Sequence, residues 1–247
     1  MSLGDKYWGN VELLLHLDGA NGGTTFTDVS KNGYSLSRGG STVTSTAQSQ
    51  FGGASAYFDG AGDWLVVPDS SNFNLGTGDF TIECFIYPET GFSSTGGTIY
   101  GDLGNSMPWL HIQDTTNYLR LYCNGQYVTS SSAVTFDTWQ HIAVSRNSGT
   151  VKMYFDGVQK ASASFTHNLS TTNDLGIGGE RSSASRYYKG YIDEFRLTKG
   201  VGRYPSAFTA PTEPFPNSPY QGMPVKDNSL RQPLKVNGNT FIHRSGI

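Results

Sequence analysis

Cysteine is scarce in this chain of 247 residues, because Cys84 and Cys123 are the only two. Two cysteines build neither a disulfide scaffold nor a zinc site. Each lies in a strand-like run, which predicts two buried free thiols, because free cysteine is among the most buried residue types. A disulfide between them remains an alternative that would require an oxidising compartment.

Charge is also sparse, at 15% of residues, and the formal net charge is −3. No global basic field is present, so no nucleic-acid partner is expected. Long apolar runs are missing, since residues 11–17 include Glu12 and His16 and are too short to span a bilayer. Residues 2–6 are polar and begin no signal region, so we expect a soluble protein that reaches any extracellular place without a standard secretion signal.

The chain is rich instead in glycine, with 31 residues, and in tyrosine and phenylalanine, with 14 each. This composition is typical of short strands joined by Gly, Asn and Asp turns. About a dozen short strands at near-regular spacing predict an all-β, two-sheet sandwich, because one open sheet of that size would curl or split. Residues 54–58 and 64–67 are predicted to form a hairpin around a Gly-rich tip, and residues 24–29 a short strand. In residues 80–87, apolar side chains alternate with a mixed set, which predicts one face turned to the core.

The composition becomes rich in proline near the C-terminus, since seven of the ten prolines lie between Pro205 and Pro233. Proline cannot donate to a strand ladder, so this region is not central sheet. Residues 211–224 indicate an extended linker, and residues 234–242 a small terminal hairpin with an Asn-Gly turn. A lone hairpin is marginal in water, so it should dock on its own body or on a neighbour. We therefore divide the chain into a domain at 1–204 and an extension at 205–247.

Four sequence runs stand in a characteristic order: DFTIECFIYP at 79–88, WQHIAV at 139–144, MYFDG at 153–157 and GYIDEFRL at 190–197. Together they resemble the laminin G-like, concanavalin A-like jelly-roll lectin/glucanase family, over roughly residues 7–204. The resemblance implies a two-sheet antiparallel jelly roll that is usually a binding or packing module and less often an enzyme. The Gly-rich N-terminal half is similar to modules of tailed-phage virion proteins and bacterial surface proteins.

A calcium site is one candidate function, because Ca²⁺ takes several hard oxygens from loops that curl round it. Asp18 opens a Gly/Asn loop, and Asp28 and Asn32 follow. The family resemblance implies one structural Ca²⁺ between this early loop and the late strand, with Asp18, Asp28 and Asp193 as ligands beside a carbonyl near Asn32. The alternative is that the early residues only stabilise turns through side-chain-to-backbone hydrogen bonds.

Glycosidase chemistry is not expected. It needs two carboxyl groups facing one bond, and Asp193 and Glu194 are adjacent in a predicted strand, where side chains point to opposite faces. No Glu-x-Asp-x-x-Glu run and no Gly-x-Ser-x-Gly motif is present either.

Sugar binding is a further candidate, because sugars need an exposed aromatic ring beside polar groups. Aromatic residues in or next to loop-rich stretches are the candidates, namely Tyr100, Trp109, Tyr118, Tyr187 and Tyr188. The alternative is that these rings are core or simple surface residues. Arg186, near the last two tyrosines, belongs to no recognisable motif and is interpreted as part of a solvated loop.

Assembly is the last candidate. The Pro-rich extension fits a segment that adds strands to a neighbouring subunit, with Phe215, Tyr220, Leu234, Phe241 and Ile242 as its apolar contacts. The alternative is a tail folded back on its own sandwich. The favoured hypothesis is a non-catalytic structural or attachment protein of a virion surface, such as a bacteriophage decoration or fibre subunit. It would assemble with other particle subunits through residues 205–247 and form a homo-oligomer. The alternative is a Ca²⁺-dependent lectin for a cell-surface glycan, on a bacterial surface or secreted.

Overall fold

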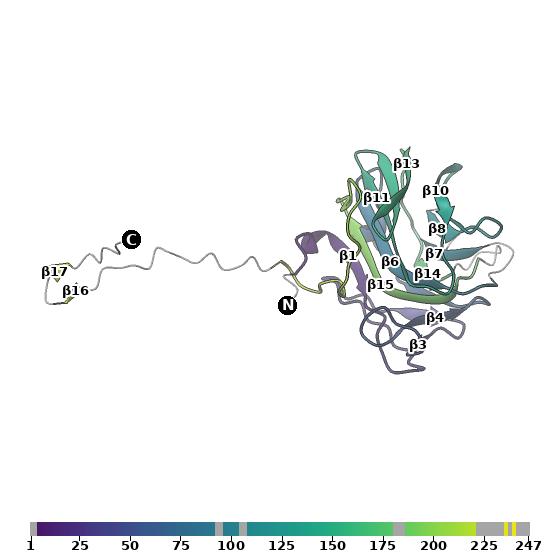
Figure 1. Ribbon diagram of the computed structural model, residues 1–247, viewed down its shortest axis with the longest axis horizontal. Helices are drawn as coiled ribbons and strands as arrows, with labels where there is room; N and C mark the ends of the chain where they lie inside the picture. Colours follow the sequence, from purple (N-terminus) through teal and green to yellow (C-terminus); the bar gives the residue numbers. More distant parts are fainter. Residues whose placement is uncertain are drawn as a thin grey trace.

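The computed structural model describes residues 4–91, 96–103, 108–179 and 186–220, and the backbone of 235–236 and 239–240. Two antiparallel sheets pack face to face, with β6, β11 and β15 in one and β7, β8 and β10 in the other (Figure 1). This confirms the predicted all-β jelly-roll sandwich. None of the helices in the described part of the chain is long and apolar enough to cross a membrane.

The eight-stranded sheet has the order β13-β12-β11-β6-β15-β4-β3, with β1 beside the second half of β15. Its strands are β1 (Val11–Leu15), β3 (Val43–Ser45), β4 (Ser55–Asp59), β6 (Phe80–Pro88), β11 (Gln140–Asn147), β12 (Thr150–Phe155), β13 (Val158–Ser164) and β15 (Lys189–Lys199). The seven-stranded sheet has the order β10-β9-β8-β7-β14-β5-β2. Its strands are β2 (Ser37–Gly39), β5 (Trp64–Val67), β7 (Gly97–Asp102), β8 (Trp109–Ile112), β9 (Tyr118–Cys123), β10 (Gln126–Ala133) and β14 (Leu175–Ile177). Two short 3₁₀ helices, η1 (Trp8–Asn10) and η2 (Ser71–Phe73), complete the sandwich.

The core lies between the sheets and follows the alternation of the strands. Phe80, Ile82, Cys84 and Ile86 of β6 are fully buried in it, as the alternation predicted. Cys84 and Cys123 are both buried and unpaired, so the predicted free thiols are confirmed and the disulfide alternative is wrong.

The predicted hairpin of residues 54–58 and 64–67 is wrong, because β4 and β5 belong to different sheets. Their connection crosses the edge of the sandwich, and the connection from β2 to β3 crosses beside it. The Asp63 carboxylate holds the two crossings together, since it accepts hydrogen bonds from the backbone N–H groups of Ser41 and Asp59. The strand predicted at residues 24–29 is also absent; Thr27 makes one isolated bridge to Ser35.

The outer face of the eight-stranded sheet is covered by the end of the described chain (Figure 1). Phe208 packs against Tyr154 at 5.3 Å, and Phe215 against Phe85 at 6.3 Å between ring centroids. Residues 205–220 therefore form a tail that folds back on its own sandwich, which was the alternative to a segment that reaches a neighbouring subunit. Farther along, β16 (Lys235–Val236) pairs with β17 (Asn239–Thr240) in the predicted terminal hairpin.

Candidate functional site

The outer face of the seven-stranded sheet carries a row of aromatic and basic side chains. Antiparallel pairing places Trp109 of β8 opposite Tyr122 of β9, and His111 opposite Arg120. Because side chains alternate along a strand, these four share one face, while Leu110 and the other intervening residues point into the core.

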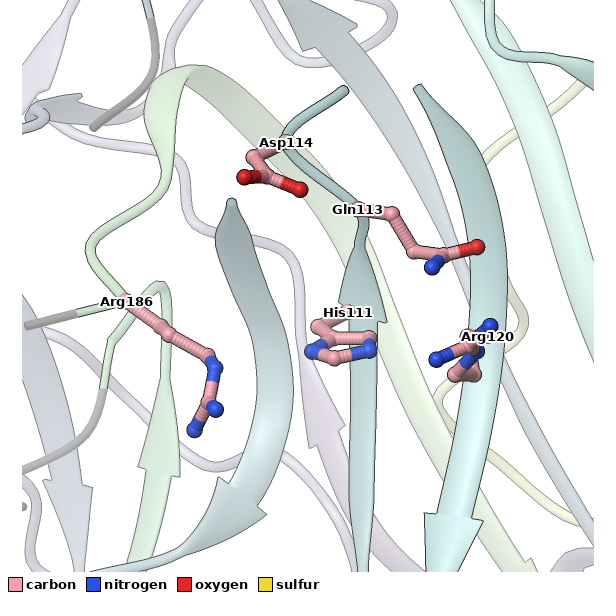
Figure 2. A pocket seen from close by; sticks show the side chains of 5 residues that line it. All are labelled: His111, Gln113, Asp114, Arg120 and Arg186. Carbon is pink, nitrogen blue, oxygen red and sulfur yellow. The ribbon is translucent and has the colours of Figure 1, made fainter. Parts of the chain in front are cut away.

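These side chains line a groove of two adjoining hollows, of about 250 Å³ and 190 Å³. His111, Arg120 and Arg186 line both hollows. Gln113 and Asp114 complete the larger one, and Trp109 and Tyr122 the smaller (Figure 2). Arg186 enters from the segment between β14 and β15, so the groove combines two sheet strands with a distant part of the chain (Figure 2).

Aromatic rings and guanidinium groups contact one another along this groove. The Cζ atom of Arg186 lies 4.7 Å from the ring centroid of Trp109, whose ring stacks beside Tyr122 at 5.9 Å. The Cζ atom of Arg120 lies 4.5 Å from the centroid of Tyr127, which is 55% exposed. Such contacts hold each cation over the ring face, so the groove presents aromatic surface and positive charge together.

Two buried polar side chains in the groove carry nitrogen atoms without hydrogen-bond partners. They are Nδ1 and Nε2 of His111 and Nε1 of Trp109. Burial, together with the nearby charges of Arg186 and Arg120, lowers the pKa of His111 to about 4. A neutral imidazole with no partner and an unpaired indole N–H are costly to bury, so both point to a ligand or to water in the groove.

The structure separates the five aromatic residues predicted to bind sugar. Trp109 lines the groove, and Tyr187 stacks on Trp64 at 5.9 Å between ring centroids. Tyr118 is half-buried on the strand that carries Arg120. Tyr100 and Tyr188 are fully buried core residues, so for these two the predicted surface ring is wrong.

Sequence reasoning missed four groove residues, namely His111, Gln113, Arg120 and Tyr122, and also Tyr127, whose ring contacts Arg120. The available signal was alternation, since WLHI in β8 and YLRLYC in β9 both alternate polar or aromatic residues with aliphatic ones. Arg186, interpreted as part of a solvated loop, belongs to the groove because its backbone carbonyl accepts from Thr98 of β7 at 3.1 Å.

The predicted calcium ligands do not come together as one set. The carboxylate of Asp28 accepts from the N–H groups of Leu14, Ser30 and Tyr34, so it closes a turn. The amide of Asn32 donates to the Glu12 carbonyl and carboxylate. Across the described residues, no group of three or more His, Cys, Asp or Glu side chains is arranged to hold a metal ion. Asp28 and Asn32 therefore do not fit a calcium cage.

Asp18 and Asp193 do lie near each other, in a separate cluster with Glu194 and His16. Oδ2 of Asp193 accepts two backbone hydrogen bonds, whereas its buried Oδ1 has no partner. Burial, together with the charges of Glu194 and Asp18 and against the two backbone hydrogen bonds, raises the pKa of Asp193 to about 7. His16 Nδ1 lies 2.7 Å from Glu194 Oε1, and that hydrogen bond raises the pKa of His16.

Asp193 and Glu194 were predicted to point to opposite faces, and this is wrong. A β-bulge follows Asp193, and Glu194 adopts a positive φ of 52°. Asp193 lies opposite the outward Phe85, Glu194 Oε2 accepts from the Phe215 N–H at 2.8 Å, and Phe195 alone turns into the core. Both carboxylates thus lie on the outer side of β15, because a bulge interrupts the alternation.

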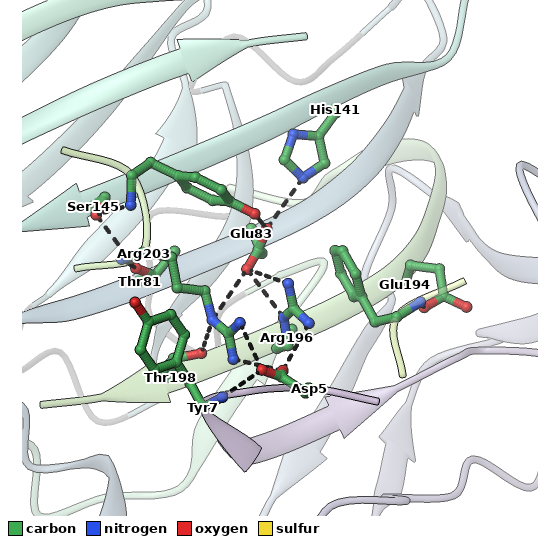
Figure 3. A network of polar contacts seen from close by, with 12 residues as sticks. Asp5, Tyr7, Thr81, Glu83, His141, Ser145, Glu194, Arg196, Thr198 and Arg203 are labelled. Atoms are coloured by element: carbon green, nitrogen blue, oxygen red, sulfur yellow. Dashed lines mark hydrogen bonds and ion pairs between the residues drawn. The ribbon is translucent and has the colours of Figure 1, made fainter. Parts of the chain in front are cut away.

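A buried ionic network lies under the covering segment of the eight-stranded sheet (Figure 3). Glu83 is fully buried, 2.9 Å from Arg196 and 3.3 Å from the Nε2 atom of His141, and it accepts from Tyr204 at 2.7 Å. Asp5 joins the network through Arg196 and Arg203. The carboxylates of Glu83 and Asp5 are bonded to the two arginines, whereas neither ring nitrogen of His141 makes a hydrogen bond. The network joins Asp5, near the start of the described chain, to β15 and to Arg203.

Residues 59–201 match the model of the concanavalin A-like lectin/glucanases superfamily, of the laminin G type. The chain belongs to this superfamily. The family match spans more than half of the sequence and includes β5 to β15, so the groove lies on the shared fold, whereas Asp5, Arg203 and Tyr204 of the ionic network lie outside the matched residues. No curated relative matches the sequence.

Solved structures of low sequence identity share this superfamily fold. Domain 4 of an extracellular arabinanase from Geobacillus stearothermophilus, in complex with arabinotriose, is 18% identical with a TM-score of 0.58, and the alignment covers 77% of this chain and 93% of that domain. A botulinum neurotoxin type C structure, whose description links cell entry to two ganglioside molecules, is 16% identical with a TM-score of 0.59 and coverage of 79% and 49%. The binding domain of botulinum neurotoxin DC, in complex with SialylT, is 14% identical with a TM-score of 0.57 and coverage of 78% and 49%. The chain thus spans about half the length of each toxin chain.

Proposed function

We propose that this chain is a carbohydrate-binding module and that the groove on β8 and β9 is its glycan site. The observation that carries this proposal is the row of aromatic and basic side chains on the outer face of the seven-stranded sheet. Sugars bind where an aromatic ring lies beside a few well-placed polar groups, and this groove supplies both.

Two structural neighbours support a glycan as ligand. The arabinanase domain was solved with arabinotriose, and the neurotoxin type C structure is described in terms of ganglioside binding. Their low identity shows a shared fold, so the choice of sugar must come from the groove of this chain.

The test is a glycan array probed with the purified protein, once with Ca²⁺ and once with chelator. We expect selective binding that Tyr122→Ala and Arg186→Ala both weaken at least tenfold, because each removes surface that the sugar contacts. The matched control is Val158→Ala, which changes an exposed apolar residue of the other sheet and should leave binding intact. Equal loss in all three variants, or binding unaffected by the first two, would place the sugar elsewhere.

We also propose a non-catalytic role. The carboxylates of Asp193 and Glu194 are both buried and both make hydrogen bonds. Glu194 is bonded to His16 and to the Phe215 N–H, and one oxygen of Asp193 accepts from two backbone N–H groups. A general acid or nucleophile needs access to the scissile bond, which these contacts obstruct. Release of reducing ends from a glycan that the protein binds would contradict this proposal.

An attachment role at a virion or similar particle surface is the second candidate. It is supported by the β16–β17 hairpin, which lies beyond the sandwich domain and belongs to the extension expected to assemble with other subunits. Among the predicted assembly contacts, Phe215 is 3% exposed and buried in its own sandwich, and Tyr220 is 49% exposed. Leu234, Phe241 and Ile242 lie outside the described residues.

The attachment role is tested by truncation. Deletion of residues 221–247 should abolish incorporation into particles and any homo-oligomer, while glycan binding persists. Normal incorporation of the truncated protein would exclude this role.

A further inference from the structure

Four aromatic side chains form a band across the outer face of the eight-stranded sheet. Tyr57 of β4 and Tyr87 of β6 both lie directly opposite Tyr191 of β15, and Trp139, which precedes β11, packs on Tyr87. From Tyr57 to Trp139, adjacent ring centroids are 4.9, 5.8 and 5.6 Å apart. Cross-strand neighbours on one face touch one another, so these four rings make one continuous surface, which we call the aromatic stripe.

The aromatic stripe is partly open to solvent. Three of its rings are half-buried, and the fourth, Tyr191, is 8% exposed between its neighbours. The next row of the same face is covered, because Phe215 of the extension packs on Phe85 of β6. The stripe therefore continues a surface on which the C-terminal extension already packs.

Carboxylates border the aromatic stripe at one edge. Asp59 ends β4 and Glu89 follows β6, with Lys189 of β15 between them. Burial, together with the charges of Glu89, Asp59 and Asp63, raises the pKa of Tyr57, so negative charge prevails at that ring. The internal residues outside the description add no net charge, since they carry one acidic and one basic side chain in 92–95, 104–107 and 180–185.

The C-terminal residues 221–247 have a complementary sequence. They carry four basic side chains and one acidic side chain, although the whole chain has a net charge of −3. Two runs combine proline, an aliphatic residue and lysine, namely Pro224-Val225-Lys226 and Pro233-Leu234-Lys235. Proline-containing segments dock on surfaces lined by aromatic rings, and residues two apart in an extended segment share one side. Each run thus offers a proline ring to an aromatic ring and an ammonium group to a carboxylate.

The extension leaves the sandwich at the opposite end of the sheet from the aromatic stripe. Pro219 forms a bridge to Asp5, which is bonded to Arg196 of β15, whereas the stripe crosses β15 near its start, at Tyr191. Strands β16 and β17 lie clear of the sandwich, on the side where the chain leaves it (Figure 1). The basic segment is therefore directed away from its own stripe, toward the place of a neighbouring molecule.

We infer that residues 221–247 of one molecule dock on the aromatic stripe of a second copy of this chain. The proline rings pack on the half-buried aromatic rings, and the lysines pair with Glu89 and Asp59. Burial of apolar surface supplies the attraction, and the opposite charges select the partner. This inference rests on the assembly role proposed for the extension, for which it names the receptor, and it is independent of the glycan groove on the other sheet.

The first experiment is sedimentation equilibrium of the full chain and its variants. We expect self-association that Tyr57→Ala weakens at least tenfold, because a central ring of the contact is lost. The double variant Lys226→Glu, Lys235→Glu should have the same effect, and association should weaken as salt is raised, because exposed charges are screened. A mixture of the two variants should restore part of the association, since each keeps the half of the contact that the other lacks.

Matched controls change the other faces of the molecule. Tyr127→Ala removes an exposed tyrosine from the seven-stranded sheet, and Lys160→Glu reverses a charge on β13. Both should leave the association unchanged. The melting temperature of each variant verifies that it folds.

Cross-linking then identifies the contact surface and its partner. A carbodiimide joins a lysine amine to a carboxyl group, so it should couple Lys226 or Lys235 to Glu89 or Asp59. In an equal mixture of full chains labelled with light and heavy nitrogen, these cross-links should include pairs of one light and one heavy peptide, because the contact joins two molecules.

The contrary outcomes are distinguishable. Association that survives Tyr57→Ala but disappears when residues 221–247 are deleted would overturn the inference and keep the assembly role. A monomer at every concentration would overturn both the inference and the expected homo-oligomer. Cross-links confined to peptides of the same isotope would also overturn it, because they would show that the segment folds over its own stripe.

Discussion

Arg186 covers the indole of Trp109, with its Cζ atom 4.7 Å from the ring centroid. The two residues are far apart in the sequence. Trp109, which the Arg186 side chain covers, is 8% exposed. The contact brings the segment before β15 onto β8, where Arg186 lines both hollows of the groove.

Replacing Arg186 by alanine should uncover this ring. The change removes a cation–π contact, which at a partly exposed site contributes about 0.5–1 kcal/mol to the free energy of unfolding. The tryptophan emission should shift to longer wavelength as water reaches Trp109. Lys160→Ala on the opposite sheet, which removes a 6.0 Å contact to Phe155, is the matched control and should leave the emission unchanged.

His111 should make the protein less stable in acid. Its folded pKa of about 4 lies below the ordinary histidine pKa of 6.5, so its contribution is fully present above the unfolded pKa and is lost as pH falls toward 4. The loss amounts to on the order of 3 kcal/mol at most, and His111→Gln should reduce it. Urea denaturation across this range measures the effect. His16→Gln is the control of opposite sign, because the pKa of His16 is raised and its contribution is lost as pH rises.

Glu83 should be indispensable to folding. Removal of one member of a buried ion pair costs about 3–5 kcal/mol, because it leaves buried charge uncompensated; here Asp5 alone would remain to balance Arg196 and Arg203. Glu83→Ala should show this loss by urea denaturation, whereas Tyr204→Phe, which removes one hydrogen bond to the same carboxylate, should cost about 1–3 kcal/mol. The pKa of Glu83 is lowered by Arg196 and His141 against the opposing effect of burial, so its contribution is lost as pH falls below the usual range of a carboxyl group. Equal small losses in both variants would show that the network relaxes.

Truncation should divide the C-terminal extension into two parts. Removing residues 221–247 should leave the melting temperature unchanged, whereas removing residues 205–247 should lower it. The longer deletion exposes Phe85 and Tyr154, which Phe215 and Phe208 now cover. Thermal unfolding of the two truncated proteins, at a concentration low enough to keep the chain monomeric, measures the difference. If both had the same melting temperature, residues 205–220 would contribute nothing to stability.

Calcium binding remains a prediction, now confined to Asp18 and Asp193. Burial raises the pKa of both carboxyl groups, the charge of Glu194 raises both as well, and the charge of Asp18 adds to the rise at Asp193; a divalent cation would relieve this repulsion. We expect Ca²⁺ added to chelator-treated protein to raise the melting temperature above neutral pH, and Asp193→Asn to abolish the rise. Asp114→Asn in the groove is the control. No rise in the unmodified protein would remove the site.

The fold could be predicted from the sequence because alternation is a local property. The positions of Ile82 and Cys84 in the sequence of β6 indicate which face of that strand is buried, without information from any other strand. Alternation could not show that β4 and β5 part into different sheets, because that depends on the contacts of Asp63 with Ser41 and Asp59. It also failed at Glu194, where the bulge is a backbone conformation that no side-chain pattern records.

The groove was only partly predictable for a related reason. Trp109 was found because it is aromatic and near a loop, but His111 and Arg120 become a pair only through the register of β8 and β9. Tyr100 and Tyr188 look like surface residues from their loop-rich surroundings and are core residues, since the opposite sheet covers them. The position of Arg186 depends on a bridge to β7 that no local pattern encodes.

Asp5 and Pro219 form a parallel bridge beside the covered sheet, so the two ends of the folded body leave it side by side (Figure 1). Asp5 is tied there to Arg196 and Arg203, whereas the groove opens on the other sheet. A tag, surface or neighbouring domain joined through either end would therefore stand behind the sandwich. The groove on the opposite sheet would then face away from whatever is attached.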